Sequence, residues 1–443
     1  MINQYNKFAA STPVAQKLQS EAEKHLPGGS TRGTAYFKPH PFWADHGDGH
    51  YLYDVDGNKY LDFMLNATSL ILGHAHPSIV AALHAQATKG VAFSAPTESQ
   101  TALSEILHKR IPSIDLLRFT SSGTEATMNA IRAACAFTGK HKIGKIEGGY
   151  HGSHDKVSIS VNPPLNQLDP SRYNPVPEFD GIPQNLLDNI VVLPFNDLDT
   201  SENIINSNKD DLSCIIMEPI VSNFGYLPAQ QNYLQGIRNI TLEYNILLIF
   251  DEVQSFRMSP GGAQQIMQIR PDLTALGKII GGGLPVGAFG GRYEVMEQFD
   301  QNIDGFIPHS GTFNGNPMSM EAGKTTLEQL DVNTYERLNH LGSVVRKKLQ
   351  SIFDELEMDA SVTGTGSFFG LHFGVREIKD YRSKILADQK MSKAIFSGLL
   401  NKGILLQQSC AGSLSTITDE SHIDALIESI RNVMQDITAE QFH

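Results

Sequence analysis

The chain has 443 residues, of which 40% are hydrophobic and 19% are charged. This is more chain than one hydrophobic core usually serves, and the composition is that of an ordinary globular protein. The formal net charge of −13 argues against nucleic acid or an anionic membrane surface as the main partner, because both require basic patches.

Neither a disulfide framework nor a membrane segment is expected. The three cysteines are few and far apart, which suits a reducing compartment. The N-terminal stretch has no basic segment followed by an apolar run, and the chain has no run of about 18 apolar residues. The sequence therefore predicts a cytoplasmic protein without a signal peptide.

The first third of the chain passes from a helix and a hairpin to a β/α pattern. Residues 14–25 predict a short amphipathic helix, and Asp-Gly-Asn at 56–58 within an alternating segment predicts a hairpin. The pattern "PSIVAALHAQAT" from residue 77 predicts a helix. A strand is expected at 116–120, followed by a loop and a helix that ends at Gly139.

The middle of the chain predicts a parallel sheet. The apolar runs at 213–219 and 246–253 have the length of buried parallel strands, and 230–245 between them predicts the crossover helix. Such alternation implies a sheet covered by helices on both faces. Residues 156–195 are rich in Pro, Asn and Asp, which predicts a long excursion loop.

The C-terminal part predicts a separate α+β lobe. A long helical stretch after 318 precedes short strands around 360–375, a helix near 388–402 and a closing helix near 422–438. We therefore expect three segments: an N-terminal helix and hairpin at 1–70 that belongs to the small domain, a large α/β domain at 71–317, and a C-terminal small α+β domain at 318–443.

The stretch "RFTSSGTEATMNAIRAA" places Ser122, Gly123 and Thr124 where a strand ends and a helix begins. Free backbone N–H groups and the positive end of the helix dipole favour a phosphate at such a point. The alternative is an ordinary Ser/Thr N-cap with Glu125 in the first turn.

Asp251 and Glu252 lie at the C-terminal end of a buried strand, where open α/β sheets place their ligands. A buried carboxylate needs a partner, and a protonated heterocyclic nitrogen would serve. The alternative is a helix N-cap or a salt bridge.

Lys278 is expected between a helical stretch and a glycine loop, where it could hold an anion, form an imine with a carbonyl, or be solvated. Tyr150 and His151 follow two glycines, and an aromatic ring there could stack on a flat ligand or cap a strand. The pair His74 and His76 has no further ligands at a zinc spacing, so structural roles are expected and no metal is predicted.

These features together match the needs of one cofactor. A helix N-terminus suits a phosphate, an acid suits a pyridinium, an aromatic side chain suits a ring face, and a lysine suits an aldehyde. The sequence therefore predicts pyridoxal phosphate, which is marked by a Schiff-base lysine and an acidic pyridinium partner.

The order of the motifs resembles the class III aminotransferases of fold type I. The stretches "SSGTEA", "GGYHG", "EPIVSNFG", "DEV", "LGKIIGGGLPVGAFGG" and "HSGTFNGNP" carry the resemblance, which is strongest to the glutamate-1-semialdehyde aminomutase-like branch with its β-phenylalanine-type aminotransferases. It implies a large, mostly parallel-sheet domain with helices on both faces and a smaller α+β domain.

The resemblance also implies catalytic roles. Lys278 would form the Schiff base and later move a proton, and Asp251 would keep the pyridine nitrogen protonated. Tyr150 would stack on one face of the ring and Val253 on the other.

Further binding roles follow from the same resemblance. Ser122, Gly123 and Thr124 would bind the phosphate. Thr312 would reach the phosphate of the partner subunit, which implies a homodimer with shared sites.

The ring edge and the substrate would have their own contacts. Asn223 and Gln254 would lie near the ring hydroxyl, with Glu218 supporting that edge. Arg32 matches the position that pairs with a substrate carboxylate in this branch, a task that suits its planar fork.

The sequence departs from the family pattern in the C-terminal part. The aminomutase carries a glutamate in a "FEAGF" stretch, and Ser409 stands there in this chain. A second arginine found in some β-amino acid members is missing too, so carboxylate recognition would rest on Arg32 alone.

We therefore predict an aminotransferase that moves an amino group from an amino acid, with β-amino acids among the candidate donors, to a 2-oxo acid such as 2-oxoglutarate or pyruvate. The alternatives are glutamate-1-semialdehyde 2,1-aminomutase, a racemase or epimerase on the same scaffold, and a non-catalytic protein that keeps the fold for binding.

Overall fold

In a computed structural model, which describes residues 2–441, the chain divides into two compact units. The larger unit comprises residues 78–336 and 378–385, and the smaller unit comprises the described parts of 1–77, 337–377 and 386–443. The expected C-terminal domain began at 318, whereas residues 318–336 and the short segment 378–385 belong to the larger unit.

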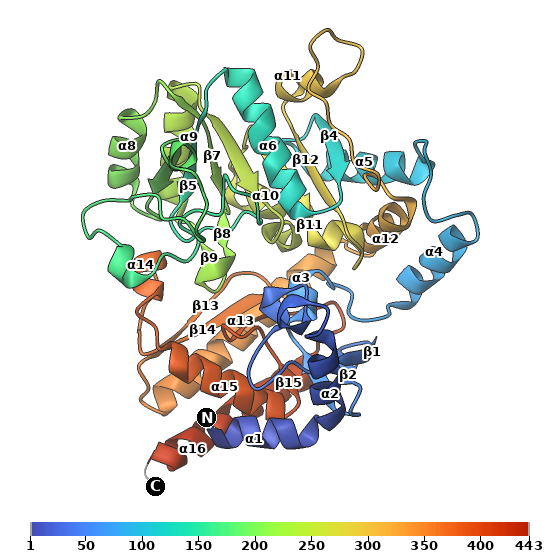
Figure 1. The fold of residues 1–443 in the computed structure, drawn as a ribbon, viewed down its shortest axis with the longest axis vertical. Helices are drawn as coiled ribbons and strands as arrows, with labels where there is room; N and C mark the ends of the chain where they lie inside the picture. Colours follow the sequence, from blue (N-terminus) through green and yellow to red (C-terminus); the bar gives the residue numbers. More distant parts are fainter. Residues whose placement is uncertain (1, 442–443) are drawn as a thin grey trace. The chain divides into compact units, whose positions relative to one another are not determined.

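The larger unit is built on a seven-stranded sheet of order β4-β12-β11-β10-β7-β5-β6 (Figure 1). Every neighbouring pair is parallel except the two that β12 makes, so the sheet is mostly parallel, as predicted. The strands are β4 (Leu116–Thr120), β5 (Lys142–Ile146), β6 (Ile190–Leu193), β7 (Leu212–Met217), β10 (Leu247–Asp251), β11 (Leu273–Gly277) and β12 (Gly287–Gly291). A small ribbon of β8 (Ile220–Val221) and β9 (Leu227–Pro228) stands apart.

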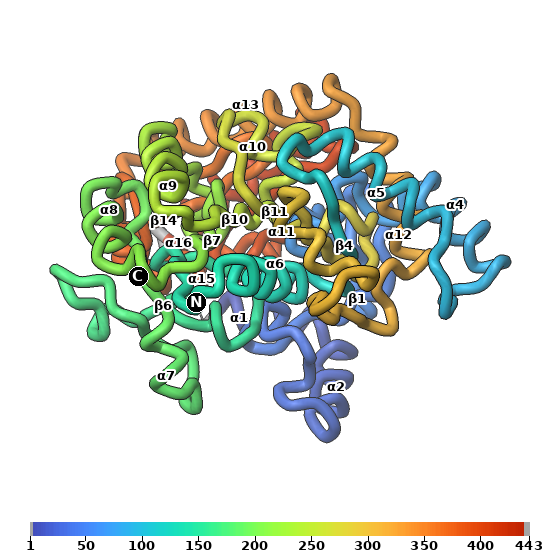
Figure 2. Tube along the Cα trace, turned by 90° about the horizontal axis from the view of Figure 1, so that it is seen from above, coloured from blue at the N-terminus to red at the C-terminus, as the bar shows by residue number. Residues whose placement is uncertain are grey.

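Helices cover both faces of this sheet. Helix α6 packs against β7, β11 and β12 through small buried residues such as Ala126, Ala130 and Ala134, which let its backbone lie close to the strands. Figure 2 shows α6 on one side of the strands and α9 on the other. The helices of the unit are α4 (Pro77–Ala87), α5 (Glu98–Arg110), α6 (Gly123–Thr138), α7 (Gln184–Leu187), α8 (Leu198–Asn206), α9 (Gln231–Glu243), α10 (Gly262–Met267), α11 (Tyr293–Met296), α12 (Pro317–Glu328) and α14 (Tyr381–Lys384).

Three sequence predictions for this unit need correction. The segment before Lys278 is the strand β11 and not a helical stretch, because a short run that is buried throughout has no periodicity to tell the two apart. The glycine-rich segment after it contains β12, although glycine is a poor strand former. The predicted loop 156–195 ends in strand β6, which is fully buried in the sheet.

The smaller unit contains two antiparallel-rich sheets, of order β1-β2-β3-β15 and β13-β14-β16. The hairpin predicted around residues 56–58 is confirmed as β2 and β3, and the predicted C-terminal helices are present. The strands are β1 (Ala44–Asp48), β2 (Tyr51–Asp54), β3 (Lys59–Asp62), β13 (Ala360–Thr363), β14 (Phe368–Phe373), β15 (Ile404–Leu405) and β16 (Ala411–Ser413). The helices are α1 (Ile2–Ser11), α2 (Pro13–Ala22), α3 (Leu65–Thr68), α15 (Gln389–Asn401), α16 (Glu420–Gln441) and the part of α13 (Val332–Glu355) that follows residue 336.

Within residues 2–441, none of the helices combines the length and the apolar character that crossing a membrane requires.

Candidate active site

The N-terminus of α6 lies at the carboxyl edge of the large sheet. Ser122 Oγ accepts a hydrogen bond of 3.2 Å from the Glu125 N–H, and the Glu125 carboxylate accepts one of 2.8 Å from the Ser121 N–H. Ser122 is therefore an N-cap, which is the structural alternative considered for this motif. The cap leaves the N–H groups of Gly123 and Thr124 without acceptors inside the helix, so the same turn offers donors to a phosphate.

Asp251 ends strand β10 and is buried. One carboxylate oxygen lies 2.9 Å from Nδ1 of His151, and the other accepts a 3.1 Å hydrogen bond from the Val253 N–H. Burial lowers the pKa of His151, so the imidazole is neutral at pH 7 and donates its Nδ1 proton to the carboxylate. The carboxylate of Asp251 thus accepts hydrogen bonds, but neutral His151 gives it no positively charged partner. A protonated ring nitrogen would be such a partner.

Glu252 has a different role from its neighbour. Its carboxylate accepts hydrogen bonds of 2.7 Å from the Ala263 N–H, 2.9 Å from the Gln264 N–H and 2.8 Å from Ser255 Oγ. It therefore holds the N-terminus of α10, which is the structural alternative considered for this acidic pair.

Lys278 follows β11 directly and opens the short 3₁₀ turn Lys278–Gly281. Its φ of 52° lies in the left-handed region, which costs a non-glycine residue energy and is often found at functional sites. A Cβ built on Gly277 would lie 3.3 Å from Val253 Cγ1 and 3.6 Å from the Gly123 Cα. The backbone at Lys278 is therefore adjacent to Val253 and to the N-terminus of α6.

The turn that carries Tyr150 and His151 is fixed against the same helix. Thr127 Oγ1 donates a 2.6 Å hydrogen bond to the His151 carbonyl, and the Ser153 N–H donates one of 3.3 Å to Thr124 Oγ1. Tyr150 is 49% exposed, so part of its side chain is accessible to a ligand.

Glu218 and Asn223 support this turn from β7 and the residues after β8. Glu218 accepts hydrogen bonds of 3.1 Å from the Tyr150 N–H and 2.6 Å from Ser222 Oγ. Burial, and then the charge of Asp251, raise the pKa of Glu218 to about 7. Asn223 Nδ2 donates to the carbonyls of Gly148, at 3.1 Å, and Val161, at 3.0 Å, so this amide joins the turn to the excursion loop.

Three predicted site residues are not tied to this group by the contacts above. Thr312 is exposed and lines a cavity of about 490 Å³ with Phe93 and Gln100. Gln254 is half-buried just before a 3₁₀ turn. Arg32 belongs to the smaller unit, where its Nη1 donates a 2.6 Å hydrogen bond to Asn66 Oδ1. The roles of all three stay predictions.

Sequence reasoning did not find the contacts of two residues that support the site. His151 stands in the motif quoted for Tyr150, but only the fold brings it to Asp251. Lys145 is fully buried on β5, and its Nζ donates to the carbonyls of Ile146 (3.1 Å) and Gly149 (3.2 Å). In the sequence it is the second lysine of the segment KIGKI, three residues before Gly148, and this pattern gives no sign that it is buried. Burial lowers the pKa of Lys145 to about 7.

These residues fit pyridoxal phosphate. The larger unit offers unpaired donors for a phosphate, a buried carboxylate for a ring nitrogen, and a lysine beside both. A family model described as "Aminotransferase class-III" matches residues 35–436. The chain belongs to the class III aminotransferase family. Its cofactor is therefore pyridoxal phosphate, as predicted from the sequence.

Relatives of this class III aminotransferase cover nearly its whole length. A glutamate-1-semialdehyde 2,1-aminomutase from Methanothermobacter thermautotrophicus is 40% identical, over 95% of this chain and 98% of the relative.

Solved structures confirm the fold type I architecture. An omega-transaminase from Sphaerobacter thermophilus has a TM-score of 0.91 and 41% identity, covering 95% of this chain and 97% of that one. A transaminase with PLP bound has a TM-score of 0.90 and 33% identity, over 97% and 99% of the two chains. A β-phenylalanine aminotransferase from Variovorax paradoxus has a TM-score of 0.90 and 31% identity, over 99% and 97%.

Proposed function

We propose that this class III enzyme is a glutamate-1-semialdehyde 2,1-aminomutase, the alternative reading of its sequence. The observation that carries this proposal is the set of curated relatives: two aminomutases, 40% and 39% identical, cover 95% and 97% of the chain. They support the aminomutase better than the aminotransferase that the sequence analysis put first. An aminomutase exchanges an amino group and a carbonyl within one substrate and needs no second keto acid.

Pyridoxal phosphate, when bound, supplies an electron-withdrawing ring that makes a substrate C–H bond acidic. Asp251 would keep the ring nitrogen protonated through its ionised carboxylate, with His151 orienting that carboxylate. Nζ of Lys278 would act first as a general base and then as a general acid. It would take the proton from the substrate carbon that bears the nitrogen and deliver it to the imine carbon of the cofactor. The N–H groups of Gly123 and Thr124, with Ser122, would bind the phosphate.

The remaining contacts would orient the ring and exclude water. Tyr150 would cover one face and Val253 the other, while Gln254 and Asn223 would lie near the ring hydroxyl. The raised pKa of Glu218 means that this carboxyl can stay protonated near neutral pH, so that it adds no second full negative charge close to Asp251.

Arg32 would bind the substrate carboxylate. Its side chain donates a hydrogen bond to the neutral amide of Asn66, a contact that does not compensate the guanidinium charge, so Arg32 suits an anion. Arg32→Ala is expected to raise KM for carboxylate substrates about tenfold or more, with a much smaller effect on simple amines. Equal losses on both substrate classes would remove Arg32 from this role.

We also propose a homodimer in which Thr312 contributes to the phosphate site of the partner subunit. Phe93 and Phe313 beside it are 49% and 59% exposed, an apolar surface of the kind that a subunit interface covers.

All three cysteines of the chain are free, which supports the predicted cytoplasmic location.

An aminotransferase is the second candidate, and one sequence observation favours it. Ser409 replaces the glutamate that the "FEAGF" stretch supplies in the aminomutase. The omega-transaminase structure, at 41% identity, is as similar to this chain as the aminomutase relatives are.

A half-reaction separates the candidates. The pyridoxal form of the enzyme is mixed, without acceptor, with diaminovalerate, α-amino acids and 3-amino acids while the cofactor absorbance is followed. Response to diaminovalerate, and turnover of the semialdehyde without a keto acid, would support the aminomutase. Stoichiometric conversion by a 3-amino acid, reversed by 2-oxoglutarate or pyruvate, would replace it with the aminotransferase, and loss of optical activity without an acceptor would indicate a racemase or epimerase. A chain that responds to none of these amines would fit the non-catalytic alternative.

A further inference from the structure

Arg382 forms a two-point ion pair next to the cofactor-facing turn. It lies on α14, in the short segment 378–385 that belongs to the larger unit although the chain on either side of it does not. Its Nε lies 2.8 Å from one Glu147 carboxylate oxygen and its Nη2 lies 3.1 Å from the other. The two side chains are 20% and 4% exposed, so the pair is largely shielded from water. Hydrogen bonds to Glu147 raise the pKa of Arg382, which stays charged.

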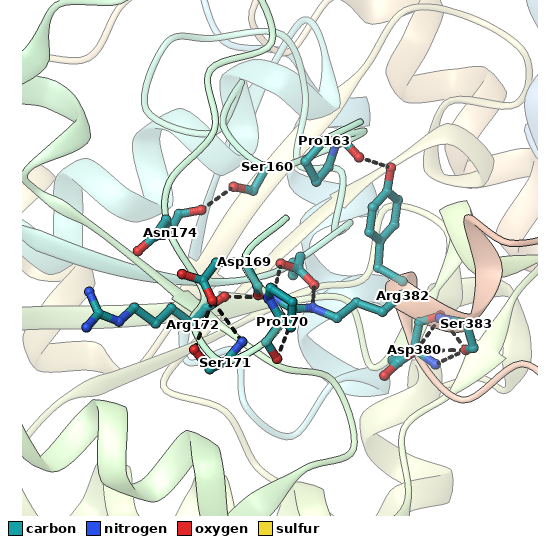
Figure 3. Close-up of polar contacts among 12 residues, drawn as sticks. Ser160, Pro163, Asp169, Pro170, Ser171, Arg172, Asn174, Asp380, Arg382 and Ser383 are labelled. Carbon is teal, nitrogen blue, oxygen red and sulfur yellow. Dashed lines mark hydrogen bonds and ion pairs between the residues drawn. The ribbon is translucent and has the colours of Figure 1, made fainter. Parts of the chain in front are cut away.

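The same guanidinium also binds the excursion loop. Its Nη1 donates to the carbonyls of Asp169 (2.8 Å) and Pro170 (3.3 Å), and its Nη2 donates to the carbonyl of Arg172 (2.8 Å). Its Cζ lies 4.0 Å from the centre of the Tyr173 ring, which adds a cation–π contact. Figure 3 shows the side chain entering the loop at these carbonyls.

The neighbouring residues of α14 strengthen the attachment. Tyr381 Oη donates a 2.9 Å hydrogen bond to the Pro163 carbonyl at the other end of the loop. Its ring lies so close to Gly148 that a Cβ there would be 2.5 Å from Tyr381 Cδ2, so only glycine permits this approach. Asp380 and Ser383 form a capping box that fixes the short helix, as Figure 3 shows.

Glu147 connects this cluster to the site. It is the residue after β5, and Gly148, Gly149, Tyr150 and His151 follow it directly. Its backbone N–H donates a 2.9 Å hydrogen bond to the Leu193 carbonyl of β6. If the arginine were lost, Glu147 would be a buried carboxylate without its cation, and the turn would have to move to solvate it.

We propose that Arg382 is a positioning residue for the cofactor: it holds Glu147 and the loop 160–174 as one body, and thereby places Tyr150 and His151. The proposal rests on the cofactor site and not on the choice between aminomutase and aminotransferase. In this arrangement the loop 160–174 is fixed to the turn that carries Tyr150 and His151.

The chain offers a matched control for the test. Arg238 pairs with Asp272 at 2.6 Å, with exposures of 14% and 3%, and also lies in the larger unit. Arg382→Met, Arg382→Lys and Arg238→Met are compared in the full-length chain. The readouts are the Kd of pyridoxal phosphate by titration of the cofactor-free protein, the amide exchange of residues 160–174 in the loaded protein, and the Tm.

We expect Arg382→Met to weaken cofactor binding tenfold or more and to speed exchange across 160–174 by a similar factor. Arg382→Lys keeps the charge but not the fork, so it should lie between the parent and the methionine variant on both readouts. Arg238→Met should lower the Tm at least as much while it leaves the Kd within twofold of the parent.

Two results would overturn the proposal. One is an Arg382→Met protein with parental Kd and parental exchange in 160–174. The other is an equal loss of cofactor affinity in Arg238→Met at equal loss of Tm, which would make the effect one of general stability. If Arg382→Met does not fold, Arg382→Lys and Tyr381→Phe carry the test: Tyr381→Phe should speed exchange around Pro163 several-fold, and parental exchange in both variants would reject the proposal.

Discussion

The two edges of the large sheet each contain a buried arginine–carboxylate pair. One pair joins regular secondary structure, and the other joins a turn to an irregular loop. At the amino edge, Asp272 precedes β11 and contacts Arg238 at 2.6 Å and Arg292 at 3.1 Å, and it accepts a 2.9 Å hydrogen bond from the Leu248 N–H. These partners lie on or next to helices and strands. At the carboxyl edge, Arg382 shares its donors between Glu147 and the carbonyls of an irregular loop.

The difference shows why a fold retains a costly interaction. Burying two charges gives little net stability over a well-packed apolar pair, but removing one partner of such a pair is strongly destabilising. At the amino edge the ion pair joins regular elements that already have a hydrogen-bonded ladder. At the carboxyl edge the loop has backbone hydrogen bonds around an isolated bridge between Ile159 and Pro177, and by our proposal the ion pair fixes residues 160–174 to the turn after β5.

The largest expected effect is that of Lys278→Ala, which tests whether the carboxyl edge carries the chemistry. Removing the base should lower kcat by roughly a thousandfold or more, because proton transfer loses its positioned group. Tm should change little, since Lys278 is only partly buried. Single-turnover absorbance measurements would check this, and a rate within tenfold of the parent would remove Lys278 from its central role.

Asp251→Asn is expected to have the next largest effect. The amide keeps the shape of the carboxylate but cannot stabilise a protonated ring nitrogen, so kcat should fall on the order of a hundredfold. The matched variant is Asp272→Asn at the amino edge, which should leave kcat near the parental value. Similar kcat losses in both variants would mean that the two edges do not differ in this way.

Glu147→Gln and Asp272→Asn should separate cofactor affinity from stability. Asp272→Asn should cost about 3 kcal/mol of unfolding free energy, because two arginines lose their buried partner. Glu147→Gln should cost less stability but weaken pyridoxal phosphate binding severalfold. Denaturant unfolding and cofactor titration would give the unfolding free energy and the Kd of pyridoxal phosphate for both variants. A larger loss of cofactor affinity in Asp272→Asn than in Glu147→Gln would contradict this difference between the two edges.

Glu218 is expected to make the stability of the protein depend on pH. Burial raises the pKa of this carboxyl to about 7 in the folded protein, so the folded state favours its protonated form. Its contribution to stability is therefore fully present below the unfolded-state pKa, near 4.5, and is lost as pH rises through 7. Relative to the parent, Glu218→Gln should gain about 3 kcal/mol between pH 4.5 and pH 8.

Unfolding of the cofactor-free protein at several pH values would test this, with Asp272→Asn as the control that should lack the trend. A parental pH slope in Glu218→Gln would contradict the assignment.

Sequence reasoning reached the fold class and the identity of the cofactor, because local patterns carry them. The roles of the individual site residues stay predictions. The residues Ser122 to Thr124 indicate a junction between a strand and a helix, and Asp251 ends an apolar run that has the length of a strand. These signals depend on neighbours in the chain, and they were sufficient for the cofactor.

Contacts between residues that are far apart in the chain could not be predicted from local sequence patterns. His151 reaches Asp251 across 100 positions of sequence, and Arg382 reaches Glu147 across 235. No local pattern encodes such contacts. Strand β11 was assigned to a helix because full burial removes the alternation that would have marked it.

The long separation between Arg382 and Glu147 has a consequence for synthesis of the chain. A polypeptide made from its amino end exposes β5 and the glycine turn long before residue 382 has left the ribosome. Every strand of the large sheet can pair before that point, since the last of them ends at Gly291. The order of appearance therefore lets the sheet form first and the loop be fixed last. A nascent chain that stops before 382 would contain Lys278 but would lack the arginine that we propose positions Tyr150 and His151.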